Sequence, residues 1–209
     1  MGNSTISNSV IKRLPRYYRF LGDLKESGVT RISSRELSER MGLTASQIRQ
    51  DLNCFGGFGQ QGYGYNVDIL QSEIGRILGL NKPKTAILIG IGNLGRAVAL
   101  HIDFETKGFH LVGLFDSKES LVGQVVRNLP IRSTSSIDEF CRENCPDAAI
   151  LCIPKEAAKG IADQLYNLGV RGFWNFSHYD LALRYTDVKV ENVHFGDSLM
   201  TLSYRLSND

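Results

Sequence analysis

Three glycines spaced as Gly90-x-Gly92-x-x-Gly95 follow a short apolar run at residues 85–89 and precede a helix-like pattern. Each glycine serves the binding of a pyrophosphate: the first turns the chain tightly, the second admits the phosphates to the backbone, and the third lets helix and strand pack closely. A helix that begins at about Asn93 points its N–H groups and the positive end of its dipole at the anion. The segment predicts a phosphate loop formed by Gly90, Ile91, Gly92, Asn93, Leu94 and Gly95.

An acidic residue lies at the position where a dinucleotide-binding site needs a carboxylate, at the end of a second apolar run. This run, residues 109–115, ends in Asp116, twenty-one residues after Gly95, and an acid at this place binds the ribose hydroxyls of NAD. Because a carboxylate repels a 2′-phosphate, Asp116 favours NAD(H) over NADP(H). The nearby Lys118, which we include in the site, weakens that preference. The alternative is a βαβ unit that binds no nucleotide.

The rest of the second half alternates between strand-like and helix-like patterns. Helices are expected at residues 136–144 and 155–168, with strands at 148–153 and 172–176, and this alternation predicts a parallel sheet covered on both sides. Ligands bind outside the carboxyl ends of such strands. The loops at 153–154 and 175–178 are therefore expected to reach a nicotinamide ring, through Pro154, Asn175 and Phe176.

Two capped helices follow each other in the first third of the chain. Ser33-x-x-Glu36 and Thr44-x-x-Gln47 have the spacing of capping boxes and predict helices that end near residues 41 and 52, with Gly42 in the turn between them. A helix, a short turn with glycine and a second helix form the helix-turn-helix plan. A plain helical hairpin is the alternative.

Polar and basic residues mark the surface that would meet DNA. The second helix faces inward with Ala45, Ile48 and Leu52, and its outer face carries types that bond base edges and phosphates, namely Ser46, Gln47, Arg49 and Gln50. The preceding helix is predicted at residues 15–26, with Pro15 in its first turn. Arg13 and Arg16 lie at its polar face and indicate either phosphate contacts or a solvated surface.

A glycine-rich segment, residues 55–65, follows the second helix directly. Its glycines alternate with aromatic and amide residues, including Gln60 and Gln61, and this composition excludes a helix. At this place the segment predicts the β-hairpin wing of a winged-helix domain. A second phosphate loop is the alternative, but no Gly-Lys-Ser/Thr follows.

Charge and composition divide the chain near Pro83, after a helix expected to be capped by Asp68. Residues 1–82 carry eleven Lys and Arg against seven Asp and Glu, whereas residues 83–209 carry thirteen against fifteen. The basic part is expected to meet a polyanion.

No secretory signal pattern and no 18-residue apolar run occur, so we expect a cytoplasmic protein with no membrane partner. Cysteines in metal-binding spacing do not occur either, which predicts no metal site.

The last residues are patterned as a strand at 190–195 and a helix that Asp197 caps, with Leu199, Leu202 and Leu206 on one face. Such an apolar stripe must be buried on its own domain or on a partner chain.

Five motifs spread over the chain are YYRFL, SSRELSERMGLTASQIRQDL, FGGFGQQGYGYNV, GIGNLG and VENVHF. With them, almost the whole chain resembles the Rex family of redox-sensing transcriptional repressors. The resemblance implies a winged helix-turn-helix DNA-binding domain at 1–82, a Rossmann NAD(H)-binding domain at 83–194, and a C-terminal helix at 195–209 swapped between subunits, next to the winged helix. It implies a homodimer that binds an inverted-repeat operator, senses the NADH/NAD⁺ ratio and leaves DNA when NADH binds. The alternatives are a small NAD-dependent dehydrogenase and a CoA-binding module.

Two histidines depart from the family pattern. Relatives often carry Tyr at the position of His101 and Asp at that of His194, and in them the acid can pair with an Arg matched here by Arg19. His194 supplies no carboxylate. His101, His194 and Arg19 are therefore either parts of an altered switch, in which protonation of the histidines brings like-charge repulsion and makes NADH-dependent release sensitive to pH, or the two histidines are neutral hydrogen-bonded fillers.

Overall fold

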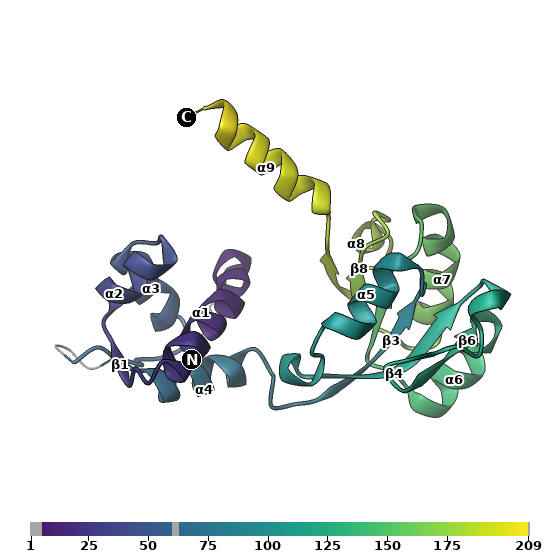
Figure 1. The fold of residues 1–209 in the computed structure, drawn as a ribbon, viewed down its shortest axis with the longest axis horizontal. Helices are drawn as coiled ribbons and strands as arrows, with labels where there is room; N and C mark the ends of the chain where they lie inside the picture. Colours follow the sequence, from purple (N-terminus) through teal and green to yellow (C-terminus); the bar gives the residue numbers. More distant parts are fainter. Residues whose placement is uncertain (1–5, 60–62, 209) are drawn as a thin grey trace. The chain divides into compact units, whose positions relative to one another are not determined.

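The computed structural model describes residues 6–59 and 63–208, and the chain forms two compact units, Met1–Lys82 and Pro83–Asp209. Figure 1 labels their elements. None of the helices among the described residues is long and apolar enough to cross a membrane.

The first unit consists of four helices and a small two-stranded sheet. Its elements are α1 (Asn8–Glu26), β1 (Arg31–Ile32), α2 (Ser34–Met41), α3 (Ala45–Asn53), β2 (Tyr65–Asn66) and α4 (Val67–Ile77). Strand β2 comes from the end of the glycine-rich segment and pairs antiparallel with β1, Ile32 opposite Tyr65. The end of the predicted wing segment therefore pairs with a strand that precedes α2, and Gln60 and Gln61 lie outside the described residues.

Helix α1 begins seven residues before the predicted start, and Pro15 lies inside it. A proline in a helix interior removes one hydrogen-bond donor and is usually unfavourable. Here the exposed Pro15 is tolerated because Val10 and Leu14 extend the buried stripe of α1 toward its N-terminus. The prediction of a start at Pro15 was wrong because burial outweighed the local preference of proline.

The prediction of two capping boxes was only partly correct. Around α2 the box is complete: the Ser33 hydroxyl accepts from the Glu36 N–H, and the Glu36 carboxylate accepts from the Ser33 N–H. At α3 the Thr44 hydroxyl accepts from the Gln47 N–H, but the Gln47 side chain turns to Asp51 instead of returning to Thr44. The Gln47 amide N–H donates to a buried carboxylate, and this bond draws the side chain away from the Thr44 N–H, from which its amide oxygen would accept in a capping box.

Asn66, and not Asp68, caps α4. The Asn66 Oδ1 accepts from the Ile69 N–H at 3.0 Å, while Asp68 lies in the first turn and pairs with Lys25 at 2.8 Å. Similarly, α9 begins at Phe195, so Asp197 lies in its first turn instead of capping it. Each acid still carries a charge that favours the N-terminal end of a helix dipole.

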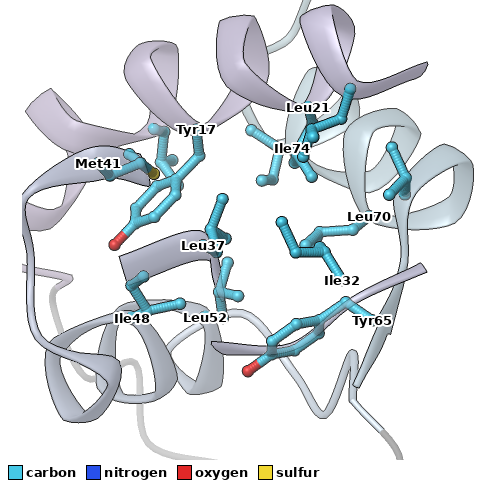
Figure 2. Close-up of a cluster of buried hydrophobic side chains, with 13 residues drawn as sticks. Tyr17, Leu21, Ile32, Leu37, Met41, Ile48, Leu52, Tyr65, Leu70 and Ile74 are labelled. Atoms are coloured by element: carbon cyan, nitrogen blue, oxygen red, sulfur yellow. The ribbon is translucent and has the colours of Figure 1, made fainter. Parts of the chain in front are cut away.

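One apolar cluster holds the first unit together. Figure 2 shows Tyr17 and Leu21 of α1, Leu37 of α2, Ile48 of α3 and Ile74 of α4 converging on one interior. All five side chains are completely buried. The helix-turn-helix formed by α2 and α3 is thus anchored on α1 and α4.

The second unit is built around a seven-stranded sheet in the order β5-β6-β4-β3-β7-β8-β9. The strands are β3 (Lys84–Ile89), β4 (Phe109–Asp116), β5 (Val125–Val126), β6 (Leu129–Ser133), β7 (Ala148–Leu151), β8 (Gly172–Asn175) and β9 (Lys189–Asn192). All neighbours are parallel except β5 and β6, which form an antiparallel hairpin. The sequence prediction lacked this hairpin because its strands are short and carry no clear alternation.

Helices cover the two faces of this sheet unequally. On one face α6 (Ile137–Asn144) and α7 (Lys155–Asn167) pack on apolar residues of β3, β4, β7 and β8, together with the short α8 (Leu181–Arg184). On the other face α5 (Asn93–His101) covers β3 and β4, but β7, β8 and β9 line a hollow of about 710 Å³. The predicted sheet with helices on both sides is confirmed, and the cover is incomplete beside the hollow.

Helix α9 (Phe195–Ser207) buries none of its residues within the chain. Its apolar side chains are exposed, among them Leu199, Leu202 and Leu206, at 67%, 50% and 73%.

Candidate dinucleotide and nucleic-acid sites

The glycine loop lies at the carboxyl end of β3, between β4 and β7. The backbone joins these strand ends: the Gly90 N–H donates to the Phe115 carbonyl at 2.8 Å, and the Cys152 N–H donates to the Ile89 carbonyl at 2.9 Å. The sheet runs outward in opposite directions from β3, so the loop occupies the switch point where nucleotides bind in such sheets.

The three glycines meet three different constraints. Gly90 has φ +90°, and a Cβ there would approach the Cys152 carbonyl oxygen to 2.5 Å. At Gly95 a Cβ would come within 1.8 Å of the Gly90 carbonyl oxygen, whereas at Gly92 it would meet nothing within 4 Å. The first and third glycines are required by the protein itself. Gly92 has open space beside it and is also the N-terminal boundary of α5.

Asp116 holds the loop directly. Its Oδ2 accepts from the Ile91 N–H at 2.6 Å, and its Oδ1 accepts from the Lys118 N–H at 2.8 Å. The residue is 9% exposed. An ionised carboxylate offers about four acceptor sites, so this one retains capacity for two ribose hydroxyls. The structure thus brings Asp116, Ile91 and Lys118 together, as a ribose site requires.

The loop after β8 is shaped by Asn175, which is completely buried. Its Nδ2 donates to the Tyr179 carbonyl and to Asn192 Oδ1, each at 2.8 Å, and its Oδ1 accepts from the Ser177 N–H at 3.0 Å. These internal bonds occupy the amide, so Asn175 forms the loop and does not face a ligand. Ser177, also buried, was missed by sequence reasoning, although the Asn-x-Ser spacing typical of such turns could have indicated it.

Phe176 remains available as an apolar wall for the ring. Its ring lies 4.8 Å from that of Trp174 and 5.9 Å from that of Phe195, between centroids. Pro154, at the N-terminal end of α7, is exposed. Aromatic residues thus lead from the carboxyl end of β8 to the first residue of α9.

His194 pairs with a residue that the sequence analysis left outside the switch. Its Nδ1 lies 2.6 Å from the Nδ1 of His178, whose backbone has the unusual φ of +59°. At this distance one nitrogen donates and the other accepts. His101 is exposed on α5, and Arg19 is exposed on α1. The partner that the sequence analysis considered for His194 was His101 or Arg19, and His178 takes that place within the chain.

The two most buried thiols are Cys152, beside Gly90, and Cys141, on α6, and both are poor nucleophiles. Burial raises the pKa of Cys152 to about 12 and that of Cys141 to about 11, so both stay protonated at neutral pH. Over residues 6–59 and 63–208 the structure places no three His, Cys, Asp or Glu side chains together as a metal site would need.

On α3 the structure separates the four expected DNA-contacting residues into two groups. Ser46, Arg49 and Gln50 are exposed, and the Arg49 Nη1 donates to Ser34 Oγ at 3.1 Å. Gln47 is half-buried, because its amide donates to the carboxylate of Asp51 at 2.8 Å.

The two arginines of α1 that were expected to meet DNA are also bound within the unit. Arg16 donates to the Met41 carbonyl at the end of α2, and Arg13 makes a two-pronged bond to Asp51. Asp51 was not identified from the sequence. A carboxylate four residues after Gln47 in a helix gives no sign of burial until α1 is packed against it.

The hollow on the sheet is not the nucleotide site. Its lining includes Lys84, Phe109, Gly172 and Lys189, the first residues of four strands. It therefore lies at the amino ends of the strands, away from Gly90 and Asp116.

Two family models match separate parts of the chain, one in the first compact unit and one almost wholly in the second. Residues 5–53 match a family described as "Putative DNA-binding protein N-terminus", and residues 81–179 match a family described as "CoA binding domain". The chain is 50% identical over 204 residues to the redox-sensing transcriptional repressor Rex of Clostridium botulinum (strain Eklund 17B / Type B), covering 98% of this chain and 97% of that protein. It is 49% identical over 204 residues to Rex of Clostridioides difficile (strain 630), with the same coverage.

Solved structures show the same likeness. A crystal structure of RSP in complex with β-NAD⁺ and operator DNA matches with a TM-score of 0.91 and 51% identity, over 99% of this chain and 94% of that one. RSP in complex with β-NADH matches with a TM-score of 0.90 and 48% identity, over 99% and 96%. With an N-terminal helix-turn-helix, a C-terminal Rossmann-type sheet and relatives alike over nearly their full length, this chain belongs to the Rex family of redox-sensing transcriptional repressors.

Proposed function

We propose that this protein is a homodimeric repressor that binds an inverted-repeat operator and leaves it when NADH binds, so that it responds to the NADH/NAD⁺ ratio. The observation that carries the proposal is the Gly90–Gly95 loop bonded to Asp116, in a chain whose other unit presents a polar helix, α3, on a helix-turn-helix. The operator DNA, NAD⁺ and NADH bound by RSP support the assignment of the same ligands here.

The residues present fit a dinucleotide. The loop from Gly90 to Gly95 would take the pyrophosphate, Asp116 the ribose hydroxyls, and Lys118 a position beside them. Pro154 and Phe176 would line the ring, in the loop that Asn175 shapes. NADH differs from NAD⁺ in a neutral instead of a cationic ring, and an apolar wall penalises the cation by the cost of burying charge. NADH shifts the protein away from DNA only if it binds the DNA-incompetent state more tightly.

Operator contacts are assigned to the exposed residues of α3 and to α1. Arg49, Ser46 and Gln50 would reach base edges, and Arg16 a phosphate. Gln60 and Gln61 of the wing stay in this proposal as additional contacts.

The dimer follows from α9. Its apolar side chains, exposed on the single chain, are expected to be covered by a second subunit. The proposed domains are a DNA-binding domain at 1–82, an NAD(H)-binding domain at 83–194 and a swapped helix at 195–209.

A dehydrogenase and a CoA-binding module are the other candidates. A dehydrogenase is disfavoured because the relatives that match this chain over nearly its full length are redox-sensing transcriptional repressors. We therefore propose a cytoplasmic regulator without catalytic activity. A CoA-binding family matches residues 81–179, but the position of Asp116 on the phosphate loop suits a ribose with free hydroxyls.

The proposal is tested by adding ligands stepwise to a complex of the purified protein with a labelled DNA duplex and measuring how much duplex is released. The duplex is selected from a random pool with the protein itself. NADH should release it at concentrations at which NAD⁺, NADPH and CoA do not, and nicotinamide fluorescence should report binding in the same range. Release by CoA alone, or turnover of NADH with a small-molecule oxidant, would contradict it.

A further inference from the structure

The carboxylate of Asp51 joins the first helix to the helix that is proposed to read DNA. Its Oδ2 accepts from Arg13 Nε at 2.6 Å and from the Tyr17 hydroxyl at 2.8 Å, while its Oδ1 accepts from Arg13 Nη2 and from Gln47 Nε2, both at 2.8 Å. Asp51 is 1% exposed. Four donors from α1 and α3 therefore surround one buried acceptor.

The charge of this carboxylate is maintained despite its burial. Burial opposes ionisation, but the hydrogen bonds from Arg13, Gln47 and Tyr17 outweigh it and hold the pKa of Asp51 below its ordinary value. Burial and, after it, the hydrogen bond to Asp51 raise the pKa of Tyr17. The group is thus an ionised acceptor throughout the physiological pH range.

Directional bonds constrain α3 in a way that its apolar contacts do not. Ile48 and Leu52 hold α3 in the core, but apolar packing tolerates small rotations of a helix. Arg13 and Tyr17 are four residues apart and point from one face of α1, as Figure 2 shows for Tyr17. A two-pronged Arg–carboxylate bond with a third donor fixes both the rotation of α3 about its axis and its position along α1.

We propose that Asp51 is a positioning residue for operator recognition and that Arg13 acts through Asp51 and not as a phosphate ligand. The exposed residues Ser46, Arg49 and Gln50 lie on the same helix as Asp51. Base readout depends on placing such side chains in the groove with correct geometry, so a rotated α3 loses sequence preference while its charge is unchanged. The inference rests on the proposal that α3 reads the operator.

Arg13→Lys and Arg13→Gln separate positioning from phosphate contact. Binding of the full chain to the selected duplex and to a random duplex is measured by fluorescence anisotropy at several salt concentrations. Lysine keeps the charge but cannot make the two-pronged bond. Both variants should weaken operator binding by about tenfold, similar to one lost base-pair contact, with random-duplex binding and the salt slope near those of wild type.

Arg16→Gln is the matched control. Arg16 lies one turn along α1, and its replacement should lower the log–log salt slope by about 1 per subunit, equally for both duplexes. If Arg13→Gln gives that same result and Arg13→Lys restores wild-type binding, Arg13 is a phosphate ligand and the proposal is overturned.

A paired variant covers the case in which single variants fail to fold. Arg13→Met combined with Asp51→Leu leaves no buried charge without a partner, an exchange that proteins often tolerate. Folding of the first unit is verified by circular dichroism and thermal unfolding, and NADH binding serves as the control for the second unit. The paired variant should bind random DNA but lose the preference for the operator, and full retention of that preference would overturn the proposal. Arg49→Gln tests the premise separately, because unchanged operator preference there would remove α3 from base readout whatever Arg13 does.

Discussion

The two sites of this protein are built from different parts of the polypeptide. The proposed dinucleotide site consists mainly of backbone: glycines whose missing Cβ atoms make room, N–H groups at the start of α5, and one carboxylate that holds the loop. The proposed DNA-reading surface consists of side chains on α1 and α3, and their freedom is decided by neighbours such as Asp51.

This difference explains why one site is easier to recognise than the other. A site formed mainly by backbone groups requires glycines at fixed spacing, so its residues can be predicted from the sequence. In a side-chain site the same arginine serves as a phosphate ligand or as an internal clamp, depending on what is packed beside it.

The largest expected contrast between the sites is in salt dependence. If each subunit neutralises roughly 3 to 5 phosphates, operator binding should fall with a log–log slope of about −5 to −9. Between 50 and 200 mM salt, the affinity should drop by about 10³ to 10⁵. NADH binding, which relies on backbone N–H groups, should change little over that range. Fluorescence anisotropy measures operator affinity and nicotinamide fluorescence measures NADH affinity at each salt concentration. Similar log–log salt slopes for the two affinities would contradict this prediction.

Next in size is the effect of Asp51→Ala on stability. The variant leaves Arg13 and Tyr17 without their acceptor, and we expect the free energy of unfolding of the first unit to fall by about 3 kcal/mol. That value is at the low end for a broken buried pair, because the Arg13 side chain is 27% exposed. Denaturant unfolding followed by circular dichroism measures it, with NADH affinity as the control for the second unit.

The same pair predicts a pH dependence. Since folding lowers the pKa of Asp51 from its ordinary 3.8, its stabilisation is complete above that value and is lost as pH falls through the lower, folded value. Asp51→Asn should flatten the acid limb of the stability profile, and an unchanged limb would mean that other carboxylates dominate it.

Gly92→Ala and Gly95→Ala should act oppositely on folding and binding. A Cβ at residue 95 meets the Gly90 carbonyl at 1.8 Å, so this variant should lose about 2–3 kcal/mol of stability. A Cβ at residue 92 meets nothing within 4 Å. That variant should keep wild-type thermal stability yet bind NADH weakly, because the methyl group occupies the path of the phosphates. Strong NADH binding by Gly92→Ala would place the pyrophosphate elsewhere.

Asp116→Ala should weaken NADH binding by at least about tenfold, since hydrogen bonds to a charged group contribute about 1.5–3 kcal/mol. Operator affinity should stay intact and release by NADH should require more ligand. Lys118→Ala, two residues away and exposed, is the control and should have a smaller effect. Full NADH affinity in Asp116→Ala would show that the ribose assignment is wrong.

The smallest expected effect concerns His178 and His194. Their Nδ1 atoms, 2.6 Å apart, share one proton, so a second proton introduces like-charge repulsion at the junction of the β8 loop and α9. The NADH concentration for half-release should therefore shift a few-fold when it is measured between about pH 5 and 8. His194→Gln should remove the shift, whereas His101→Gln, at the exposed last residue of α5, should keep it. Identical pH profiles in all three proteins would make the pair a neutral hydrogen bond.

Local patterns were sufficient for much of this fold. The Ser33–Glu36 box, the helix at Asn93 and the strand ending in Asp116 depend on nearest neighbours in the chain, which the sequence displays directly. The true start of α1, the Asn66 cap and the β5–β6 hairpin could not be predicted, because each depends on packing or on competition between adjacent candidates.

The sequence alone determined the glycine loop between β3 and α5 and the carboxylate at the end of β4, since glycine spacing and an acid at a strand end are local features of the chain. Tertiary structure decided which polar side chains remain available for ligands. Asn175 is occupied by Tyr179 and Asn192, Arg13 and Gln47 by Asp51, and His194 by His178. The physical reason is that a buried polar group requires a partner from another element, and no local pattern shows which elements will meet.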